Sequence, residues 1–317
     1  MKRGDISLHL MTRRIHFVSP KLLWLCLLAW GLPMLLAAQS KPKKSFKLPA
    51  VLQEVSGLYY AGPDSLWWLN DSGDKPRLFL TNGEGQIKKE VLLPLQNRDW
   101  EDLTADDNGT IYIGEFGNNQ SLRNDLKIYT YHVATEKVDS IEYNYPDQVR
   151  FDQRTSFDYS FNMEGFFWHQ DSLHLFSKCA LPKSNYLTKH YVLSDQPGTQ
   201  TAILRDSLVL KKRAVTAAAI HAETGRVALL AYYYNKILGF WPVSRANVFF
   251  FDDYPKGYFL RGKQWKKRAS FLIATQYESL DFLPDHYFYI ASEQTRWIKP
   301  RVKRMRIPKR YRRAVKP

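Results

Sequence analysis

The chain has 317 residues, 44% of them apolar and 15% aromatic, which is enough to bury a core in one large domain or two ordinary ones. Its net charge of +15 lies on the two ends, because residues 48–295 hold 26 basic and 30 acidic side chains, a net of −4. This distribution excludes a protein that is basic throughout.

The N-terminus predicts an export signal over residues 1–38. Arg13, Arg14 and Lys21 precede a charge-free apolar run over 22–38 that ends in two small residues. The alternative is an uncleaved membrane anchor, since the run of 17 residues approaches the length that crosses a bilayer. We therefore expect a bacterial protein that is periplasmic, on the cell surface or secreted.

Cysteine usage limits how the mature chain can be stabilised. Cys26 lies inside the apolar run and would leave with the signal, so Cys179 would remain alone. One cysteine cannot form an internal disulfide, so stability must come from packing. Residues 39–45 read as a basic linker that leads into the folded body.

The first structural unit begins near Glu54 and contains four predicted strands. They are expected at 54–60, 66–69, 77–80 and 87–95, with turns at Gly62-Pro63-Asp64 and at Asn82-Gly83-Glu84-Gly85. The second of these strands ends in Asn70-Asp71-Ser72-Gly73.

The second unit shows the pattern most clearly, in the stretch NRDWEDLTADDNGTIYIGEFGNN over 97–119. An acidic cluster of Asp99, Glu101 and Asp102 opens one strand, and the next strand, 110–113, closes at Glu115. The Asn-Gly between them predicts a hairpin, because both central residues of a primed turn need positive φ. In an antiparallel pair, the opening of the first strand and the end of the second lie at the same end of the sheet.

Similar units recur along the chain. Their openings lie at Glu54, Glu101, Glu164, Thr216 and Glu278, separated by 47, 63, 52 and 62 residues. A weak period of this size with four short strands per unit predicts an all-β fold, a single β-propeller of five four-stranded blades. The long gaps leave a sixth blade open, and a large β-sandwich is the alternative fold.

The last unit is short of strands, with 301–307 as its third. We expect the N-terminal strand 46–52 to close the ring, which would make 46–307 the propeller. Closure removes two open sheet edges that would otherwise invite aggregation.

The repeated acids predict one shared opening, here called the acidic mouth. By analogy with known propellers, the first strand of each blade lines the central channel, so strand-opening residues ring one mouth and the ends of the second strands return to it. The candidate metal or ligand residues are Glu54, Asp71, Glu101, Glu115, Glu164, Glu278 and Glu293, with Asn70, Asn118 and Lys178 nearby.

Several carboxylates around one low-dielectric opening must take up protons, pair with cations such as Lys178, or bind a cation. Oxygen ligands without clustered His or Cys suit Ca²⁺ or Mg²⁺ rather than zinc. The alternative is architectural: each acid caps a strand or accepts hydrogen bonds from the amides of a neighbouring blade.

Motifs of common hydrolases and nucleotide-binding proteins are missing from the sequence. It contains no HExxH, no phosphate-binding P-loop and no GxSxG elbow, and its histidines show no metal-ligand spacing. His174 lies within an apolar strand, so we expect it to be buried and hydrogen-bonded.

The basic C-terminal tail, residues 308–317, and the strand before it could bind an anionic surface. The candidate residues are Arg304, Arg306, Lys309, Arg310, Arg312 and Arg313. The alternative is a solvated edge strand followed by a disordered end. Nucleic acid is not an expected partner for an exported protein.

Taken together, the motifs SGL, NDSG, DWED and GEFGNN over 54–131 resemble a widespread family of exported bacterial propeller proteins. More distantly the chain is similar to gluconolactonase/regucalcin-type, NHL-type and phytase-like propellers. In the lactonases a Glu, an Asn and an Asp hold a divalent cation that polarises a lactone carbonyl. Glu54 would match that Glu, whereas Glu101, Glu164 and Thr216 stand where later blades would supply the Asn and Asp.

The sequence therefore predicts an exported β-propeller that serves as a monomeric binding or scaffold module, with an unknown ligand or envelope protein at the acidic mouth. The alternative is a divalent-cation-dependent hydrolase of a lactone, ester or phosphoester at the same mouth.

Overall fold

A computed structural model of the chain describes residues 44–148, 160–178, 186–237, 241–269, 275–295 and 298–312. The expected export signal, Cys26, Cys179 and Arg313 lie outside these residues. Among the described residues, no helix has the length and apolar character needed to span a bilayer.

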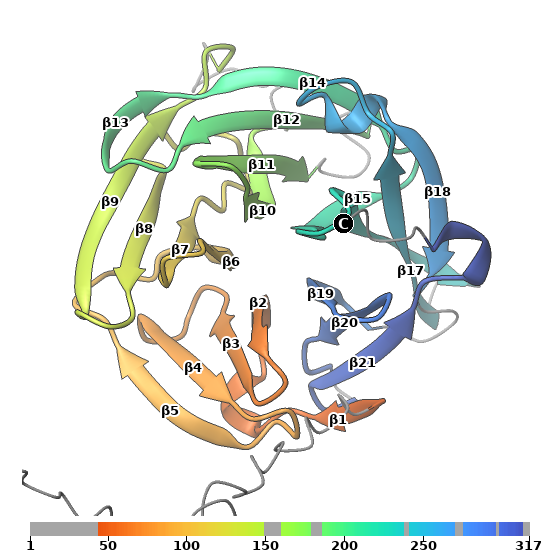
Figure 1. Ribbon diagram of the computed structural model, residues 1–317, viewed down its shortest axis with the longest axis horizontal. Coiled ribbons are helices and arrows are strands. Elements are labelled where there is room, and N and C mark those ends of the chain that lie inside the picture. Colours follow the sequence, from red (N-terminus) through yellow and green to blue (C-terminus); the bar gives the residue numbers. More distant parts are fainter. Residues whose placement is uncertain are drawn as a thin grey trace, which may run out of the picture. The chain divides into compact units, whose positions relative to one another are not determined.

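The body from residue 44 onward is a five-bladed β-propeller (Figure 1), as the repeats predicted. Blade 1 consists of β2 (Val55–Gly62), β3 (Ser65–Asn70), β4 (Arg77–Thr81) and β5 (Ile87–Leu92). Blade 2 consists of β6 (Trp100–Ala105), β7 (Thr110–Glu115), β8 (Lys127–His132) and β9 (Lys137–Asn144). Blade 3 consists of β10 (Asn162–Trp168), β11 (Ser172–Lys178), β12 (Leu187–Ser194) and β14 (Ile203–Val209).

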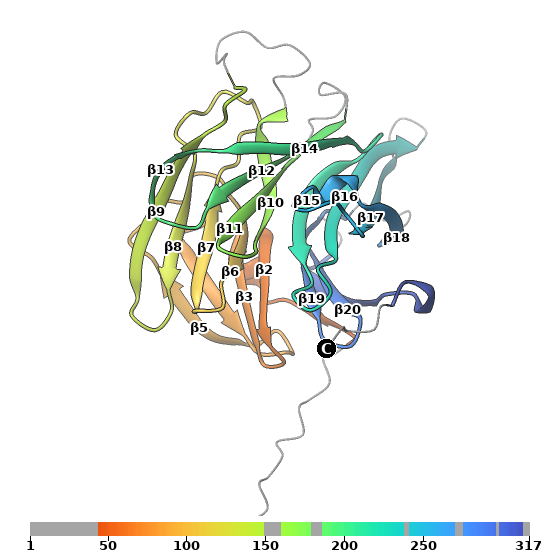
Figure 2. The same ribbon diagram turned by 45° about the horizontal axis from the view of Figure 1, so that its top comes forward.

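Blade 4 consists of β15 (Ala214–Ile220), β16 (Val227–Ile237), β17 (Trp241–Asp252) and β18 (Lys263–Arg268). Blade 5 consists of β19 (Tyr277–Leu283), β20 (Tyr287–Ser292), β21 (Arg301–Arg306) and β1 (Ser45–Lys47). In every blade the first strand is innermost (Figure 1), and Figure 2 shows β2, β6 and β10 running alongside one another.

An N-terminal strand closes the ring, as expected. β1 pairs antiparallel with β21, and Phe46 lies opposite Val302. The strand is shorter than predicted, because Pro49 has no N–H to donate and a short 3₁₀ helix, η1 (Ala50–Leu52), follows it. The Phe46 ring packs edge-on against Tyr289 at 5.7 Å, which fixes the closing strand to blade 5.

Two strands lay beyond the sequence prediction. β13 (Gly198–Thr201) adds to blade 2 by pairing parallel with β9. β18, the outer strand of blade 4, has Trp265 as its one apolar residue and so lacks an alternating pattern. Trp265 anchors this strand by stacking on Phe250 at 4.0 Å.

The hydrophobic core lies between blades, in five clusters that each join two neighbouring sheets. On β3, Trp68 packs toward blade 5 and Trp67 toward blade 2, because successive side chains on a strand point to opposite faces. Both faces of a blade are therefore buried, which explains why its inner strands are apolar almost throughout.

Polar groups on the inner strands join adjacent blades. Among the described residues, the hydrogen bonds that do this include Phe166 N to Asp102 Oδ2 at 3.2 Å, Trp168 N to Thr104 Oγ1 at 3.2 Å, Thr216 Oγ1 to Tyr277 O at 2.9 Å, and Tyr60 N to Asp281 Oδ2 at 2.7 Å. They tie blade 2 to blade 3, blade 4 to blade 5 and blade 5 to blade 1.

Glycines mark two places where inner strands approach most closely. A Cβ on Gly57 would lie 2.8 Å from Leu103 N of blade 2, and one on Gly165 would lie 2.6 Å from Ala217 C of blade 4. No side chain fits at such distances, so the glycine of the SGL motif is a packing requirement of the ring.

Candidate metal centre

Each inner strand carries a register irregularity near its start, opposite the second strand of its blade. The residues skipped by the pairing are Ser56, Glu101 with Asp102, Glu164, Thr216 and Glu278. A β-bulge bends a strand and re-aims a side chain. Four of the five predicted repeat anchors are thus bulge residues, which explains how strand residues can turn toward the channel mouth.

Glu54 is the exception among the anchors. It lies in the turn before β2 with its side chain exposed, and Ser56 occupies the bulge of blade 1. The carbonyl of Glu54 accepts a hydrogen bond from Asp71 N at 2.9 Å, so this residue positions the mouth through its backbone.

Five carboxylates from three blades converge to form what we call the carboxylate centre. The ligand oxygens of Asp71, Asp99 and Glu101 lie within 4.8 Å of one another, and so do those of Asp71, Glu278 and Glu293. Asp71, just after β3, belongs to both groups and links blade 2 to blade 5.

Glu101 is the most enclosed of these groups on blade 2. Its side chain is 3% exposed, and none of the hydrogen bonds among the described residues reaches its carboxylate. Burial, with Glu164 and Asp71 nearby, raises its pKa well above the ordinary value. The carboxyl therefore faces other carboxyls without a hydrogen-bond donor of its own.

Gly117 covers this side of the centre. A Cβ at this position would lie 2.4 Å from Glu101 Oε1 and 2.4 Å from Asp99 Oδ2. The second glycine of the GEFGNN motif is therefore required because no side chain fits beside the two acids. The sequence pattern alone does not predict this requirement.

On blade 5, Glu278 and Glu293 are held by one amide. Gln276 Nε2 donates to Glu293 Oε2 at 3.0 Å and to Glu278 Oε1 at 3.3 Å. Burial and the neighbouring Glu278 raise the pKa of Glu293 to about 11, so in the absence of a cation this pair shares a proton. Burial also raises the pKa of Asp71 to about 6.

Glu164 lies beside the centre with its own cation. Lys178 Nζ is 2.8 Å from Glu164 Oε1, and Asn162 Nδ2 donates to the same oxygen at 2.6 Å. Burial raises the pKa of Glu164 to about 7, against the lowering effect of Lys178. This pair is a neutralised border of the centre.

Glu115 is the clearest case of the architectural alternative. It forms a 2.9 Å ion pair with Arg123 and accepts a hydrogen bond from Arg98 N at 2.9 Å. Its carboxylate is thus used to hold the loop before β6. Asn118 has a similar role, because its Oδ1 accepts hydrogen bonds from Leu122 N and Arg123 N.

None of the ion pairs among the described residues includes a member of the carboxylate centre. The structure therefore brings together four of the predicted residues, Asp71, Glu101, Glu278 and Glu293, and adds Asp99 from the DWED motif. Five acids without a paired lysine or arginine must bind protons or a cation.

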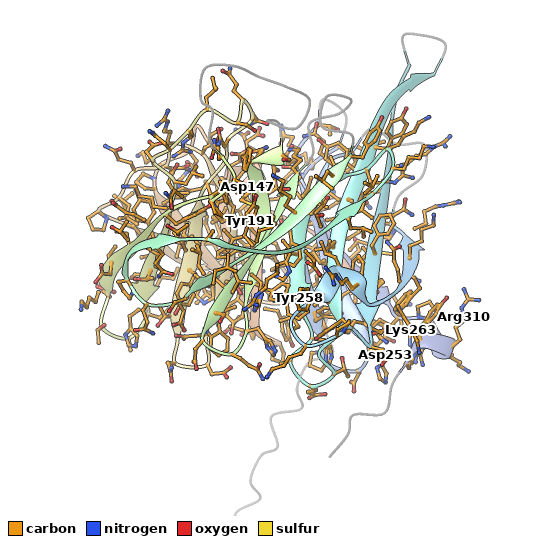
Figure 3. All side chains as sticks on the ribbon, turned by 90° about the horizontal axis from the view of Figure 1, so that it is seen from above. Asp147, Tyr191, Asp253, Tyr258, Lys263 and Arg310 are labelled. Carbon is orange, nitrogen blue, oxygen red and sulfur yellow. The ribbon has the colours of Figure 1, made fainter. Side chains whose placement is uncertain are left out.

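The predicted basic residues lie on the outside of blades 4 and 5. Arg304 and Arg306 belong to β21, and Lys309, Arg310 and Arg312 lie in and just after the short 3₁₀ helix η4 (Lys309–Tyr311). Figure 3 shows Arg310 close to Lys263 of β18.

The described part of the C-terminal tail packs against blade 4. The Tyr311 ring stacks on Trp265 at 4.0 Å, and its carbonyl accepts a hydrogen bond from Arg226 Nη2 at 2.6 Å. Arg226 is buried and also pairs with Asp252 at 2.8 Å. Residues 309–312 are therefore attached to the propeller through Tyr311.

His174 is buried, as predicted, in a polar chain that crosses blade 3. Its Nδ1 lies 3.0 Å from His190 Nε2, and His190 Nδ1 lies 2.9 Å from Asp206 Oδ1. Burial lowers the pKa of His174 to about 2, so both histidines are neutral at pH 7.

No family model and no curated protein matches the chain. Solved structures with a similar fold include a mannose phosphorylase from Leishmania mexicana, at 12% identity and TM-score 0.49, over 85% of this chain and 90% of that one. An α-L-arabinanase from Penicillium chrysogenum in complex with arabinobiose matches at 9% identity and TM-score 0.49, over 82% and 96%. A member of the DUF4221 family from Bacteroides vulgatus matches at 10% identity and TM-score 0.41, over 78% and 76%. No functional argument rests on these similarities, and the resemblance to gluconolactonases stays a prediction.

Proposed function

We propose that this protein is an exported β-propeller that serves as a binding or scaffold module of the bacterial envelope. Its ligand or partner protein binds at the acidic mouth, where a hard divalent cation completes the carboxylate centre. The observation that carries this proposal is Glu101, a buried carboxyl that accepts no hydrogen bond from the described residues and faces two further acids.

The centre can hold one divalent cation, and its irregular arrangement suits calcium better than magnesium. Calcium binds oxygen ligands at about 2.3–2.6 Å, so two ligands on opposite sides of one ion lie nearly 5 Å apart. The ligand oxygens of both carboxylate groups fall within 4.8 Å of one another. Mg²⁺ is smaller and demands near-octahedral geometry, which irregularly placed acids from three blades satisfy less well.

The experiment is a calorimetric titration of the mature chain with Ca²⁺ and Mg²⁺. We expect saturable Ca²⁺ binding that Glu101→Gln or Glu278→Gln weakens at least tenfold, the equivalent of about 1.4 kcal/mol. Glu164→Gln should weaken binding less, because Lys178 already neutralises that carboxylate. Glu136→Gln, at the exposed turn after β8, is the control.

Absence of both heat and thermal stabilisation at millimolar Ca²⁺ would remove the cation from the proposal. Equal affinities in wild type and in both centre variants would place the ion elsewhere on the chain.

A cation-dependent hydrolase at the same mouth is the second candidate. The observation favouring it is that Asp71 and Asp99 are partly exposed, whereas Glu101, Glu278 and Glu293 are buried. A cation held here would therefore face solvent on one side, where a substrate carbonyl or phosphoryl oxygen could bind it. Hydrolysis of lactone, ester or phosphoester substrates by the Ca²⁺-loaded protein, lost in Glu101→Gln, would support this candidate; equal rates in the two proteins would reject it.

The outer side of blades 4 and 5 is the proposed attachment surface for an anionic membrane. Burial and the neighbouring Arg301 and Lys267 lower the pKa of Lys303, so like charges from β18 and β21 crowd one another. Residues 254–277 and 294–312 contain no acid, and the four acids between them lie at 278, 281, 285 and 293. Asp253 pairs with Lys263 at 3.3 Å, but basic side chains outnumber acids on these strands, and such an excess of positive charge favours an anionic lipid surface.

Sedimentation with vesicles tests this attachment. We expect binding to phosphatidylcholine–phosphatidylglycerol vesicles that raised salt weakens and that pure phosphatidylcholine does not support. The triple substitution Arg306→Gln, Lys309→Gln and Arg310→Gln should reduce it while keeping the Tyr311 stack. Lys88→Gln with Lys89→Gln on blade 1 is the control, and an equal loss there would contradict a localised surface.

A further inference from the structure

The channel has a second cavity at the end opposite the carboxylate centre. Its volume is about 480 Å³, and no residue of the carboxylate centre lines it. The last residues of all five inner strands contribute, among them Tyr59, Thr104, Trp168, Ile220 and Asp281. This volume lies within the range of small-molecule binding sites, and the axis of a propeller gives it a wall from every blade.

Charge in this second cavity is of one sign. Its lining includes Asp107, Glu223 and Asp281 but no lysine or arginine among the described residues, although the chain carries 46 basic side chains. His169 and His221 also line it, and burial lowers the pKa of both, so they do not supply positive charge at pH 7. Burial raises the pKa of Asp281 to about 7, so the negative potential comes mainly from the exposed Asp107 and Glu223, and a bound cation would favour the ionised form of Asp281.

The carboxylates lie at two depths. Asp281 is partly buried on β19, where its oxygens accept hydrogen bonds from Tyr60 N at 2.7 Å and Phe282 N at 2.7 Å. Asp107 and Glu223 are exposed at the rim, on turns of blades 2 and 4. One acid is thus fixed by the backbone inside the cavity, and two stand at its entrance.

Aromatic side chains make up much of the remaining wall. Tyr59, Trp168 and Phe282 line the cavity together with the carboxylates. Burial, followed by Asp281 and Asp107, raises the pKa of Tyr59 to about 12, which places the phenol among these acids. Neither group of metal-ligating residues found among the described residues lies here, and the walls are largely apolar.

We propose that the second cavity binds a small organic cation, an ammonium group attached to an apolar or aromatic body. The carboxylates attract the positive group, and the faces of the aromatic rings contact the ammonium group and the apolar body. An anion would find no lysine or arginine to pair with, and a metal ion would find its potential ligands spread over separate blades.

Titration with phenethylammonium tests the proposal, with 2-phenylethanol as the neutral counterpart of the same shape. Both titrations are followed by NMR on the full mature chain in saturating Ca²⁺. We expect saturable binding of the amine, with the alcohol at least about tenfold weaker. Ala222→Lys places a like charge at the exposed rim and should weaken the amine about tenfold while leaving the alcohol unchanged.

Two further variants separate the cavity from folding defects and from the carboxylate centre. Asp281→Asn should weaken amine binding, but Asp281 also accepts two backbone N–H groups, so Asp107→Asn with Glu223→Gln provides the exposed pair for comparison. Glu278→Gln should leave amine binding unchanged. Equal affinity for amine and alcohol, no saturable binding at millimolar amine, or loss of binding in Glu278→Gln would each overturn the proposal.

Discussion

Two consecutive residues, Glu101 and Asp102, show how one inner strand serves two purposes. Both are buried acids whose pKa is raised above the ordinary value by burial. The Asp102 carboxylate accepts hydrogen bonds from Leu103 N at 2.8 Å and from Phe166 N of blade 3 at 3.2 Å. The Glu101 carboxylate accepts none from the described residues and faces Asp71 and Asp99 instead. Hydrogen bonding, and not residue type, separates the acid that joins blades from the acid that faces other carboxyls.

The same division holds around the ring. Asp281 and Glu115 accept backbone N–H groups as Asp102 does, and Asp281 also lines the second cavity. Among the described residues, the side chains of Glu278 and Glu293 form hydrogen bonds only with each other and with the Gln276 amide. They therefore resemble Glu101, which also faces other carboxyls. The acids around the ring therefore divide, residue by residue, into those that hold backbone groups and those that face other carboxyls.

The largest expected effect comes from removing the acid that joins blades. Asp102→Ala leaves two buried N–H groups without an acceptor, at about 1–3 kcal/mol each, so we expect a loss of about 3 kcal/mol or more in unfolding free energy. Glu101→Ala should change the cation-free protein by less than about 1 kcal/mol, since the lost packing is offset by relief of repulsion. Urea unfolding of the mature chain measures both.

Asp102→Asn is the matched control, because it keeps one carbonyl oxygen and should fall between wild type and alanine. If Glu101→Ala proved as destabilising as Asp102→Ala without a cation, the distinction between the two acids would fail.

A smaller effect on stability is expected from Gly117→Ala, which acts on two acids of the carboxylate centre. Its methyl group would occupy the space within 2.4 Å of both Glu101 Oε1 and Asp99 Oδ2, so these carboxylates must move apart. We expect at least tenfold weaker Ca²⁺ binding by calorimetry and a stability loss of about 1–3 kcal/mol, typical of overpacking. Unchanged calcium affinity would show that Asp99 and Glu101 do not hold the ion.

The propeller could be predicted from the sequence because each unit carries its own turn and strand signals. Turn signals such as Asn108-Gly109 and apolar strands such as 110–113 require no knowledge of the rest of the fold, although only Gly109 has the positive φ expected of a primed turn, and 111–115 are buried on both faces. The closing strand was also predictable, since the last unit lacked a partner. By contrast, the pattern of β18 contains one apolar residue, and its position depends on Trp265 meeting Phe250 across the blade.

The site was predictable only in part, because its composition depends on register. The sequence repeats predict Glu54 as a strand-opening acid, whereas the bulge falls at Ser56 two residues later. Asp99 stood in the recognised DWED motif, yet its approach to Asp71 depends on how the loop before β6 folds back. The Glu115 carboxylate is not part of the site because it accepts a hydrogen bond from Arg98 N and pairs with Arg123. No spacing in the sequence predicts these contacts.

The smallest expected effect separates the carboxylate centre from the histidines of blade 3 by pH. In the cation-free protein, Glu164 with a pKa of about 7 and Asp71 with one of about 6 bind protons more tightly folded than unfolded. Their contribution to stability is complete at about pH 4 and is lost as pH rises toward 7. His174, with a pKa of about 2, does the opposite, since its contribution is complete above about pH 6.5 and is lost below it.

These opposed contributions predict a shallow pH dependence between about pH 5 and 7.5, on the order of 1 kcal/mol, that two substitutions should unmask. Glu164→Gln should make the protein relatively more sensitive to acid, because the carboxyl contribution that opposes the histidine contribution becomes smaller, with Asp71 still present. His174→Asn should make it relatively more stable at low pH. If the carboxylate centre binds Ca²⁺, saturating Ca²⁺ should have the same effect as Glu164→Gln, because a bound cation favours the ionised acids. Thermal unfolding across this pH range measures all three effects. A Ca²⁺ effect on stability that is independent of pH would count against a carboxylate site.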